Sequence, residues 1–229
     1  MTREHPAEAR LKEHIQAVLF DLDGTLLDTL ADIASCVNMV LAELGLPPHP
    51  KEAYKYFVGD GLTELLMRAL PARALRGPGL KARARRFEEL YEAHSMDETR
   101  PYPGIARMLD SVARRGLRMA VVSNKPQRFT QQCVSALLPR WRFDVVRGAR
   151  ARVPLKPDPA GPLAAARAMA VRPAAVLYLG DTGVDMKTAV AAGMFPVGAL
   201  WGFRQAQELR SFGARLLIRR PGELAALLG

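Results

Sequence analysis

The sequence predicts a protein of the α/β class, with an open parallel sheet that carries helices on both faces and a small all-helical domain inserted near its start. Short apolar runs alternate with amphipathic helical stretches along most of the 229 residues, which is the order typical of such sheets. The exception is the segment 28–100, where helical patterns follow one another and no strand pattern is visible. Acidic and hydroxyl residues follow directly after several apolar runs, and open α/β sheets bind their ligands at that edge.

The first strand is predicted at residues 17–20, where the apolar run Ala-Val-Leu-Phe ends abruptly in a polar loop. A helix is expected at residues 30–44, because its apolar residues lie along one helical face and Gly45 can end it. Thr29 and Asp32 are candidates for the cap at the start of this helix, although aspartate is not the usual partner in that position.

The stretch that follows the first helix continues with helical patterns alone. Apolar periodicity predicts helices at residues 62–70 and 80–94, separated by a proline and a Gly-Pro-Gly turn. We therefore assign residues 28–100 to a helical domain inserted after the first strand. Residues 1–27 and 101–229 then form one α/β core of the Rossmann-like type.

Helices and strands alternate through the rest of the chain. Gly116 ends one predicted helix, and Pro159 begins another with Asp158 as its expected cap. Each predicted strand is a short apolar run of the buried type. The helices are expected at residues 105–116, at 126–138, from 159 onward and up to 192, and the strands at residues 117–122, 144–146, 176–179, 195–199 and 216–218.

The composition is that of an ordinary globular protein, with 49% hydrophobic and 24% charged residues. No apolar run approaches the ~18 residues of a membrane span, and residues 1–14 lack the apolar stretch of a secretory signal. Cys36 and Cys133 form no CxxC pair and lie near no cluster of histidines, so two buried free thiols are expected. We therefore expect a cytoplasmic protein with no membrane attachment and no obligate protein partner.

The formal net charge is +10, and basic residues cluster between Arg73 and Arg86. A basic surface can bind nucleic acid. The run from Lys81 to Arg86 carries no interleaved aromatic residues, however, and it fits equally the solvated face of a helix or the attraction of small anionic substrates. We expect no nucleic-acid partner, and salt-dependent retention on DNA would test that expectation.

Two aspartates, Asp21 and Asp23, follow directly after the first strand. Residues i and i+2 at an extended strand end point the same way, so both carboxylates can face one site. One can attack phosphorus to form an aspartyl-phosphate, while the other protonates the leaving oxygen and then deprotonates the attacking water. Gly24 and Thr25 would let the backbone approach the phosphoryl oxygens and supply a hydroxyl donor, although Asp-Gly is also a common pair in solvated turns.

The segment Asp-Leu-Asp-Gly-Thr-Leu-Leu-Asp-Thr, which begins at Asp21, resembles the first motif of the haloacid dehalogenase-like superfamily. Three further motifs of that superfamily follow in order: Ser123 after a strand, Lys156 in Leu-Lys-Pro-Asp-Pro, and Asp181 with Asp185 in Gly-Asp-Thr-x-x-Asp. The resemblance implies that Asp21 is the nucleophile and that Ser123 binds the phosphoryl group. It also implies that Lys156 balances the negative charge around them.

The same resemblance implies a Mg²⁺ site. Asp21, Asp181 and Asp185 would hold the ion with their carboxylates, and Asp23 would contribute its backbone carbonyl while its side chain transfers protons. Several carboxylates beside a phosphate repel one another without a cation, and Mg²⁺ prefers oxygen ligands. Phosphoryl transfer then needs mainly positioning and charge stabilisation.

The helical insertion lies where this superfamily places a mobile cap, a lid that excludes water and selects the substrate. Within it, Val-Gly-Asp-Gly-Leu at residues 58–62 resembles phosphoglycolate phosphatases, and so do Ser-Asn-Lys-Pro at 123–126 and Trp-Gly-Phe at 201–203. Glycines before a helix can direct backbone amides at a carboxylate, but a plain turn and a solvated arginine are the alternatives. The candidate substrate-binding residues are Gly24, Thr25, Asn124, Lys125, Gly59, Gly61 and Arg68.

These features predict a magnesium-dependent phosphomonoester hydrolase that acts through an aspartyl-phosphate on a small anionic metabolite, with 2-phosphoglycolate as the first candidate. A pyrophosphatase or a sugar-phosphate phosphatase or phosphomutase of the same superfamily is the alternative. Cleavage of carbon–halogen or carbon–phosphorus bonds is disfavoured, because Asp23 supplies an acid that such relatives do not use. A basic nucleic-acid-binding or adaptor protein on the same fold would have no need of these five residues together: Asp21, Asp23, Ser123, Lys156 and Asp181.

Overall fold

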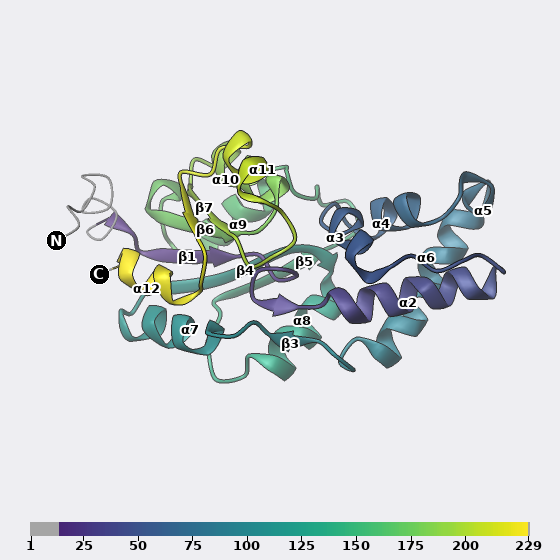
Figure 1. The fold of residues 1–229 in the computed structure, drawn as a ribbon. Coiled ribbons are helices and arrows are strands. Elements are labelled where there is room, and N and C mark those ends of the chain that lie inside the picture. The colour runs from purple at the N-terminus through teal and green to yellow at the C-terminus, as the bar shows by residue number, and fades with distance from the viewer. Residues whose placement is uncertain (1–13, 229) are drawn as a thin grey trace.

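The computed structural model describes residues 14–228, and the part of the predicted core at residues 1–13 lies outside them. Within the described residues, six strands form one sheet in the order β5-β4-β1-β6-β7-β8, and every neighbouring pair is parallel. The predicted α/β class with an open parallel sheet is thus confirmed (Figure 1). The strands are β1 (Ala17–Phe20), β4 (Arg118–Pro126), β5 (Val145–Ala149), β6 (Val176–Gly180), β7 (Phe195–Ala199) and β8 (Leu216–Ile218).

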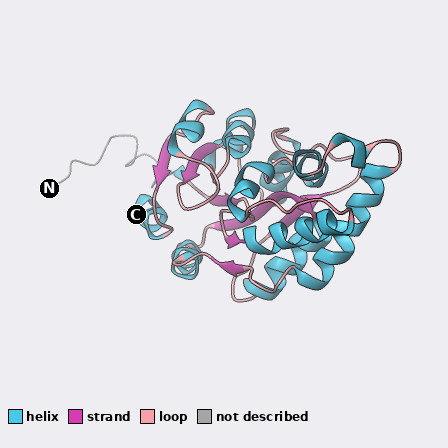
Figure 2. Cartoon of the chain, turned by 45° about the vertical axis from the view of Figure 1, so that its right-hand side comes forward, coloured by secondary structure: helices cyan, strands magenta, loops and turns pink. Residues whose placement is uncertain are grey.

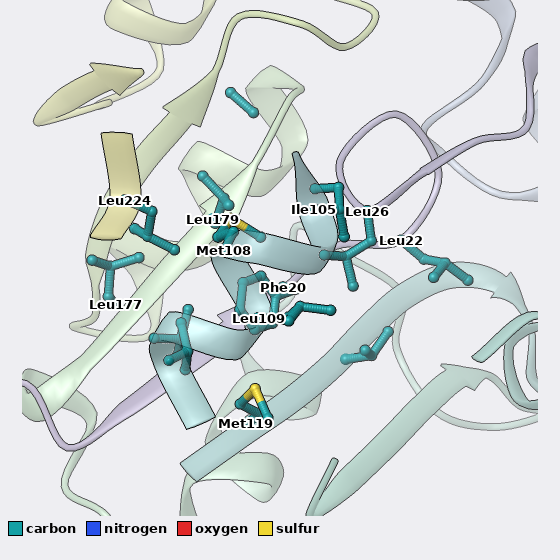
Figure 3. Packing of buried hydrophobic residues seen from close by; sticks show 14 of the residues in the cluster. Phe20, Leu22, Leu26, Ile105, Met108, Leu109, Met119, Leu177, Leu179 and Leu224 are labelled. Atoms are coloured by element: carbon teal, nitrogen blue, oxygen red, sulfur yellow. The ribbon is translucent and has the colours of Figure 1, made fainter. Parts of the chain in front are cut away.

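Helices cover both faces of the sheet because alternate residues of its central strands point to opposite sides. On β1, Val18 and Phe20 pack with apolar residues of α7, α8 and α12. Figure 3 shows Phe20 in this cluster with Met108 and Leu109 of α7. The helices on this face are α7 (Ile105–Arg114), α8 (Gln127–Leu137) and α12 (Gly222–Leu228).

The opposite face is built from the remaining strand residues. Ala17 and Leu19 of β1 pack with Ala165 and Met169 of the α9 segment and with Ala189 of α10. Figure 2 shows the helices on the two sides of the strands. The further elements of the core are α9 (Ala160–Ala168), η2 (Pro173–Ala175), α10 (Gly183–Ala191) and α11 (Ala206–Ser211).

The helical insertion forms a second body beside the sheet, next to α8 and away from α12 (Figure 1). It has its own hydrophobic cluster, in which Tyr54, Leu66 and Tyr91 are almost fully buried. Two aromatic residues of the core, Phe129 and Phe203, belong to the same cluster and so join the two bodies. The elements of this cap are α2 (Leu30–Glu43), η1 (Lys51–Ala53), α3 (Tyr54–Phe57), α4 (Leu62–Ala69), α5 (Ala72–Leu75) and α6 (Gly79–His94).

The chain enters and leaves the cap through a pair of two-residue strands, β2 (Leu27–Asp28) and β3 (Arg100–Pro101), which pair antiparallel. The Asp32 carboxylate accepts hydrogen bonds from the backbone N–H groups of Glu98 and Thr99, each at 2.9 Å. These bonds link the start of α2 to the residues just before β3. The predicted cap at Thr29 and Asp32 is therefore wrong, because Thr29 makes no side-chain cap bond and Asp32 serves this long-range contact.

Most remaining predictions of elements agree with the structure within a few residues. Strand β4 runs on to Pro126, beyond the predicted end at 122, and the short helices α3 and α5 were not predicted. Asp158 accepts the N–H of Ala160 at 2.8 Å, as a cap would, although α9 itself begins only at Ala160. Both cysteines are free and buried. Among residues 14–228 no helix is both long and apolar enough to cross a membrane.

Candidate active site

A cavity of about 50 Å³ lies between the carboxyl ends of the central strands and the cap. Polar side chains of the core form one side, and they lie just after β1, in the last part of β4 and in the loop after β5. Apolar side chains form most of the other side. The core residues that line it are Asp21, Asp23, Ser123, Asn124, Lys125, Pro126, Phe129 and Lys156, and the cap residues are Ile33, Val58, Gly59, Gly61, Leu62, Leu65, Phe87 and Tyr91.

Asp21 lies at the end of β1, where its backbone N–H still bonds to the Leu179 carbonyl of β6 at 2.9 Å. Its carboxylate is almost fully buried and forms an ion pair of 2.7 Å with the Lys156 ammonium. The pKa of Asp21 is raised to about 7, because burial and the charge of Asp185 both raise it and Lys156 offsets only part of this rise. Asp21 therefore belongs to a site that is short of positive charge.

Asp181 lies at the end of β6, beside Asp21. Its Oδ1 accepts the Thr25 hydroxyl at 2.8 Å and its Oδ2 accepts the backbone N–H of Phe203 at 2.8 Å. Burial raises its pKa well above the usual value, and the charges of Asp185 and Asp21 add to that rise. The predicted substrate ligand Thr25 does not line the cavity, since its hydroxyl instead holds Asp181 in place.

Asp185, in the first turn of α10, is the most heavily hydrogen-bonded carboxylate of the site. Its Oδ2 accepts the backbone N–H and the hydroxyl of Thr182, at 3.0 and 2.6 Å, in a capping box. Its Oδ1 accepts Lys156 at 2.7 Å and the Tyr178 hydroxyl at 3.4 Å. Both oxygens are thus occupied by protein donors, and Asp185 orients Lys156 toward Asp21.

Three buried carboxylates meet at this point: Asp21, Asp181 and Asp185 each place an oxygen within 4.8 Å of the others. The ion pairs that the described residues form with this cluster all involve one cation, Lys156, whose pKa is raised well above its usual value by Asp185 and Asp21 despite its burial. Such an excess of buried negative charge fits a divalent cation that takes oxygen ligands. Asp23 is not part of this cluster.

The Asp23 carboxylate instead faces Lys125, whose ammonium lies 3.0 Å from Oδ1 and 3.2 Å from Oδ2. Lys125 also donates to the hydroxyl of Tyr91, a residue of the cap, at 2.8 Å. Burial alone would lower the pKa of Lys125, but Asp23 and Tyr91 raise it above its usual value, so the ammonium is retained. The predicted substrate ligand Lys125 is therefore already paired with Asp23.

Ser123 and Asn124 follow the central part of β4 into the cavity wall. Ser123 Oγ accepts the backbone N–H of Lys125 at 3.2 Å. The Asn124 amide group accepts the backbone N–H of Lys156 at 2.8 Å and donates to the carbonyls of Lys156 and Gly59, both at 3.0 Å. Asn124 therefore links the Lys156 loop to the cap rather than leaving its amide free for a substrate.

The cap segment 58–61 closes one side of the cavity. Gly59 and Gly61 have φ angles of 129° and 92°, which residues with a Cβ rarely adopt. Arg204 of the core, whose side chain is 9% exposed, donates to the carbonyl of Val58 at 3.1 Å. Two side-chain donors of the core, Asn124 and Arg204, thus bind the carbonyls of this cap segment.

Two predicted substrate ligands lie elsewhere. Arg68 pairs with Asp60 at 2.6 Å and donates to the Phe57 carbonyl at 3.2 Å, outside the cavity. Its charge is paired within the cap in this structure, so a contact with a substrate carboxylate would require this ion pair to break. Gly24, with φ 83°, does not line the cavity either; its Cα backs onto the Asp181 carboxylate so closely that a Cβ would overlap it.

The structure adds residues that the sequence reasoning did not assign to the site. Tyr91 and Arg204 were not identified, because a tyrosine near Phe87 on a helix face and one of many arginines carry no distinguishing pattern. The Trp-Gly-Phe segment at 201–203 was noted but had no role. In the structure the Trp201 indole donates to the Thr25 carbonyl at 2.9 Å, next to the Phe203 bond to Asp181.

The chain is similar to several known proteins. A family model described as haloacid dehalogenase-like hydrolase matches residues 18–199. A phosphoglycolate phosphatase of Pseudomonas putida is 34% identical over 92% of this chain and 78% of its own. An N-acetylmuramic acid 6-phosphate phosphatase of Pseudomonas aeruginosa is 30% identical over 93% of this chain and 95% of its own.

The fold is also found among solved structures. A crystal structure described as a predicted phosphoglycolate phosphatase from Haemophilus somnus superposes with a TM-score of 0.87, at 24% identity, over 94% of this chain and 99% of that one. At this level of identity the likeness concerns the fold, with its sheet and its helical cap.

Proposed function

The chain belongs to the haloacid dehalogenase-like hydrolases, and on that premise we propose that it hydrolyses phosphate monoesters of a small anionic metabolite through an aspartyl-phosphate on Asp21. One observation carries the proposal. Asp21 and Asp23 both line the cavity under the cap, and each is paired with its own buried lysine: Lys156 for Asp21 and Lys125 for Asp23. Asp21 belongs to the acidic cluster and Asp23 does not, which supports different tasks for the two carboxylates.

The first half of the reaction transfers the phosphoryl group to the protein. An oxygen of Asp21 attacks phosphorus while the bond to the ester oxygen breaks, and Asp23 gives its proton to the departing oxygen. We propose that Lys156 and the Ser123 hydroxyl, which both line the cavity, bind the phosphoryl oxygens. The products of this half are the free alcohol and an acyl phosphate on Asp21.

The second half releases phosphate. Asp23, now a carboxylate, takes a proton from a water molecule that attacks the same phosphorus. The bond to the Asp21 oxygen breaks, and both the Asp21 carboxylate and the proton on Asp23 are restored. One acid–base group therefore serves both halves, as each proton that it gives away is returned.

Mg²⁺ is the cation that we propose for the acidic cluster, where it would neutralise charge between the nucleophile and the phosphoryl group. Asp21, Asp181 and Asp185 would hold it with their carboxylates, since each of the three places an oxygen within 4.8 Å of the others. We propose the backbone carbonyl of Asp23 as a further ligand, since its side chain faces Lys125.

We propose 2-phosphoglycolate as the first substrate, in line with the relatives of that name. Among the described residues the cap contributes no cation to the cavity, so the carboxylate of this substrate would have to meet backbone N–H groups. The start of α4, just after Gly61, offers such groups, since the first N–H groups of a helix have no acceptor within it. A bulky sugar would instead meet the apolar wall of Leu62, Leu65 and Phe87.

The test is kcat/KM with Mg²⁺ and with a chelator on four compounds: 2-phosphoglycolate, ethyl phosphate, N-acetylmuramic acid 6-phosphate and pyrophosphate. A bond to a charged group is worth about 1.5–3 kcal/mol, so 2-phosphoglycolate should exceed ethyl phosphate by roughly ten- to a hundredfold. Equal kcat/KM for those two compounds would rule out 2-phosphoglycolate as the preferred substrate, but it would not contradict phosphatase activity. Hydrolysis of none of the four would remove the proposed function, and undiminished activity with chelator would remove the metal.

Arg68→Ala is the matched variant for the substrate assignment. Arg68 lies outside the cavity and is paired with Asp60, so this variant should keep the preference for 2-phosphoglycolate. A loss of the preference in Arg68→Ala would mean that the cap rearranges and that Arg68, rather than the start of α4, binds the carboxylate.

A further inference from the structure

Lys125 is held between two residues from different parts of the protein. Its ammonium donates to both oxygens of Asp23, at 3.0 and 3.2 Å, and to the hydroxyl of Tyr91 at 2.8 Å. The Lys125 side chain is 4% exposed, so these three contacts use the donors of an ammonium that has little access to water. Asp23 belongs to the catalytic core, whereas Tyr91 belongs to α6 of the cap.

Tyr91 is itself fixed by its neighbours. Its ring stacks on Phe87, with centroids 5.3 Å apart, and meets Phe129 of α8 edge to face at 5.0 Å. On the protein surface, Arg128 bridges from α8 to Glu88 and Glu92 of α6, at 3.2 and 2.9 Å. These contacts pack one face of α6 against the start of α8. This packing places the Tyr91 hydroxyl within hydrogen-bond distance of Lys125.

A purely structural role for Tyr91 would need only its ring. A phenylalanine would make the same contacts with Phe87 and Phe129, and the hydroxyl adds nothing to them. The hydroxyl is instead a hydrogen-bond acceptor for the same ammonium that donates to Asp23. Burial raises the pKa of Tyr91 above its usual value, so the phenol stays neutral and accepts this bond.

Resting on the function proposed above, we infer that Tyr91 is a positioning residue of the hydrolysis: through Lys125 it holds the Asp23 carboxyl group where it can give its proton to the leaving oxygen. The cap then contributes to the chemical step although none of its side chains is assigned to the phosphoryl group. Without the hydroxyl, Lys125 has one fixed contact fewer, and Asp23 is less well aligned with the ester oxygen.

The experiment compares two substrates of similar size that differ in their need for an acid. Ethyl phosphate releases an alkoxide, which must be protonated, whereas acetyl phosphate releases acetate, a weak base with a pKa near that of a glutamate side chain, about 4–5. The kcat/KM value covers the steps up to departure of the leaving group, so the later hydrolysis of the aspartyl-phosphate does not enter the comparison. The measurement is made on the full chain with saturating Mg²⁺.

In Tyr91→Phe, kcat/KM for ethyl phosphate should fall roughly ten- to a hundredfold. Losses of this size are expected when a general acid is present but out of position. The value for acetyl phosphate should change far less. Tyr54→Phe is the matched control: Tyr54 is also a buried cap tyrosine, but its hydroxyl donates to Asn38 at 2.6 Å, away from the cavity. That control should leave both values as they are in the wild type.

Lys125→Met supplies the second test, because it should produce the same selective loss on ethyl phosphate. Adding Tyr91→Phe to it should cause no further loss, since residues that act as one unit are not additive. An equal fall on ethyl phosphate and acetyl phosphate in Tyr91→Phe, or no fall on either, would overturn the inference. If the wild-type protein hydrolyses neither of these compounds nor 2-phosphoglycolate, the proposed function itself fails, and that result is separate from a failure of the role of Tyr91.

Discussion

The Thr25 hydroxyl donates a hydrogen bond of 2.8 Å to Asp181 across a sequence separation of 156 residues. This bond joins the loop after β1 to the end of β6, and the Phe203 N–H holds the other oxygen of the same carboxylate. Asp181 is therefore oriented from two sides before any cation binds. Gly24 and Gly202 make room for this carboxylate, because a Cβ at either position would overlap it.

The first prediction concerns Gly24. Gly24→Ala should abolish most activity and weaken Mg²⁺ binding, because φ is 83° and the new Cβ would overlap the Asp181 carboxylate. Gly45→Ala is the control: φ is 66° there too, but nothing lies within 4 Å of the new Cβ. It should lose about 1–2 kcal/mol of unfolding free energy from the left-handed backbone and keep its activity.

Gly202→Ala tests whether the defect of Gly24→Ala comes from the overlap with Asp181 or from the strained backbone at Gly24. Its new Cβ would also overlap Asp181, but its φ is not in the left-handed region. Steady-state kinetics and a Mg²⁺ titration should show the same defect as in Gly24→Ala. Normal Mg²⁺ affinity in both variants would mean that Asp181 is not a ligand of the ion.

The second prediction concerns the nucleophile. Asp21→Asn should reduce kcat/KM by ~10³-fold or more while leaving the fold intact, because an amide does not attack phosphorus. Asp158→Asn, at an exposed position before α9, is the control and should keep full activity. A rate within a factor of ten of the wild type in Asp21→Asn would show that another group forms the covalent intermediate.

The third prediction concerns pH. The pKa of Asp21 is raised from its ordinary 3.8 to about 7, so the folded, metal-free protein holds a proton that the unfolded chain has already lost. The stability that this proton contributes is fully present below pH 4 and is lost as pH rises through about 7. The Tm of the metal-free protein should therefore fall between pH 5 and pH 8 more steeply than that of Asp21→Asn.

Mg²⁺ should reverse this trend, because its binding requires ionised carboxylates and displaces their protons. Isothermal titration calorimetry should show the affinity for Mg²⁺ rising with pH through about 7, where Asp21 ionises. An affinity that does not vary between pH 6 and pH 8 would contradict the assignment of Asp21 as a ligand.

The fourth prediction concerns the docking of the cap. Arg204→Met removes the donor to the Val58 carbonyl, and a charged hydrogen bond of this kind is worth about 1.5–3 kcal/mol. The closed arrangement should become less populated, so KM for small esters should rise roughly tenfold. Limited proteolysis near β2 and β3 should also become faster.

Arg210→Met is the matched control, since Arg210 is an exposed arginine of the neighbouring helix α11. It should change neither KM nor the rate of proteolysis. If Arg204→Met behaves like this control, the docking of segment 58–61 does not depend on Arg204.

The sequence by itself determined the α/β class and the residues that follow its strands. Each of these features is local: an apolar run of four or five residues is a buried strand, and the polar residue after it lies at the carboxyl edge of a parallel sheet. For this reason Asp21, Ser123 and Asp181 were placed at one edge without any knowledge of their contacts. The helical insertion was visible because no apolar run of the strand type interrupts its periodicity.

Only the tertiary structure decided which partner each polar group takes. Lys125 was expected to bind substrate and is paired with Asp23, while Arg68 is paired with Asp60 inside the cap. Thr25 faces Asp181, and Tyr91 reaches Lys125 from the cap. A buried polar group binds whichever donor or acceptor lies within about 3 Å of it. That choice depends on how segments far apart in sequence pack together, and no pattern within either segment contains it.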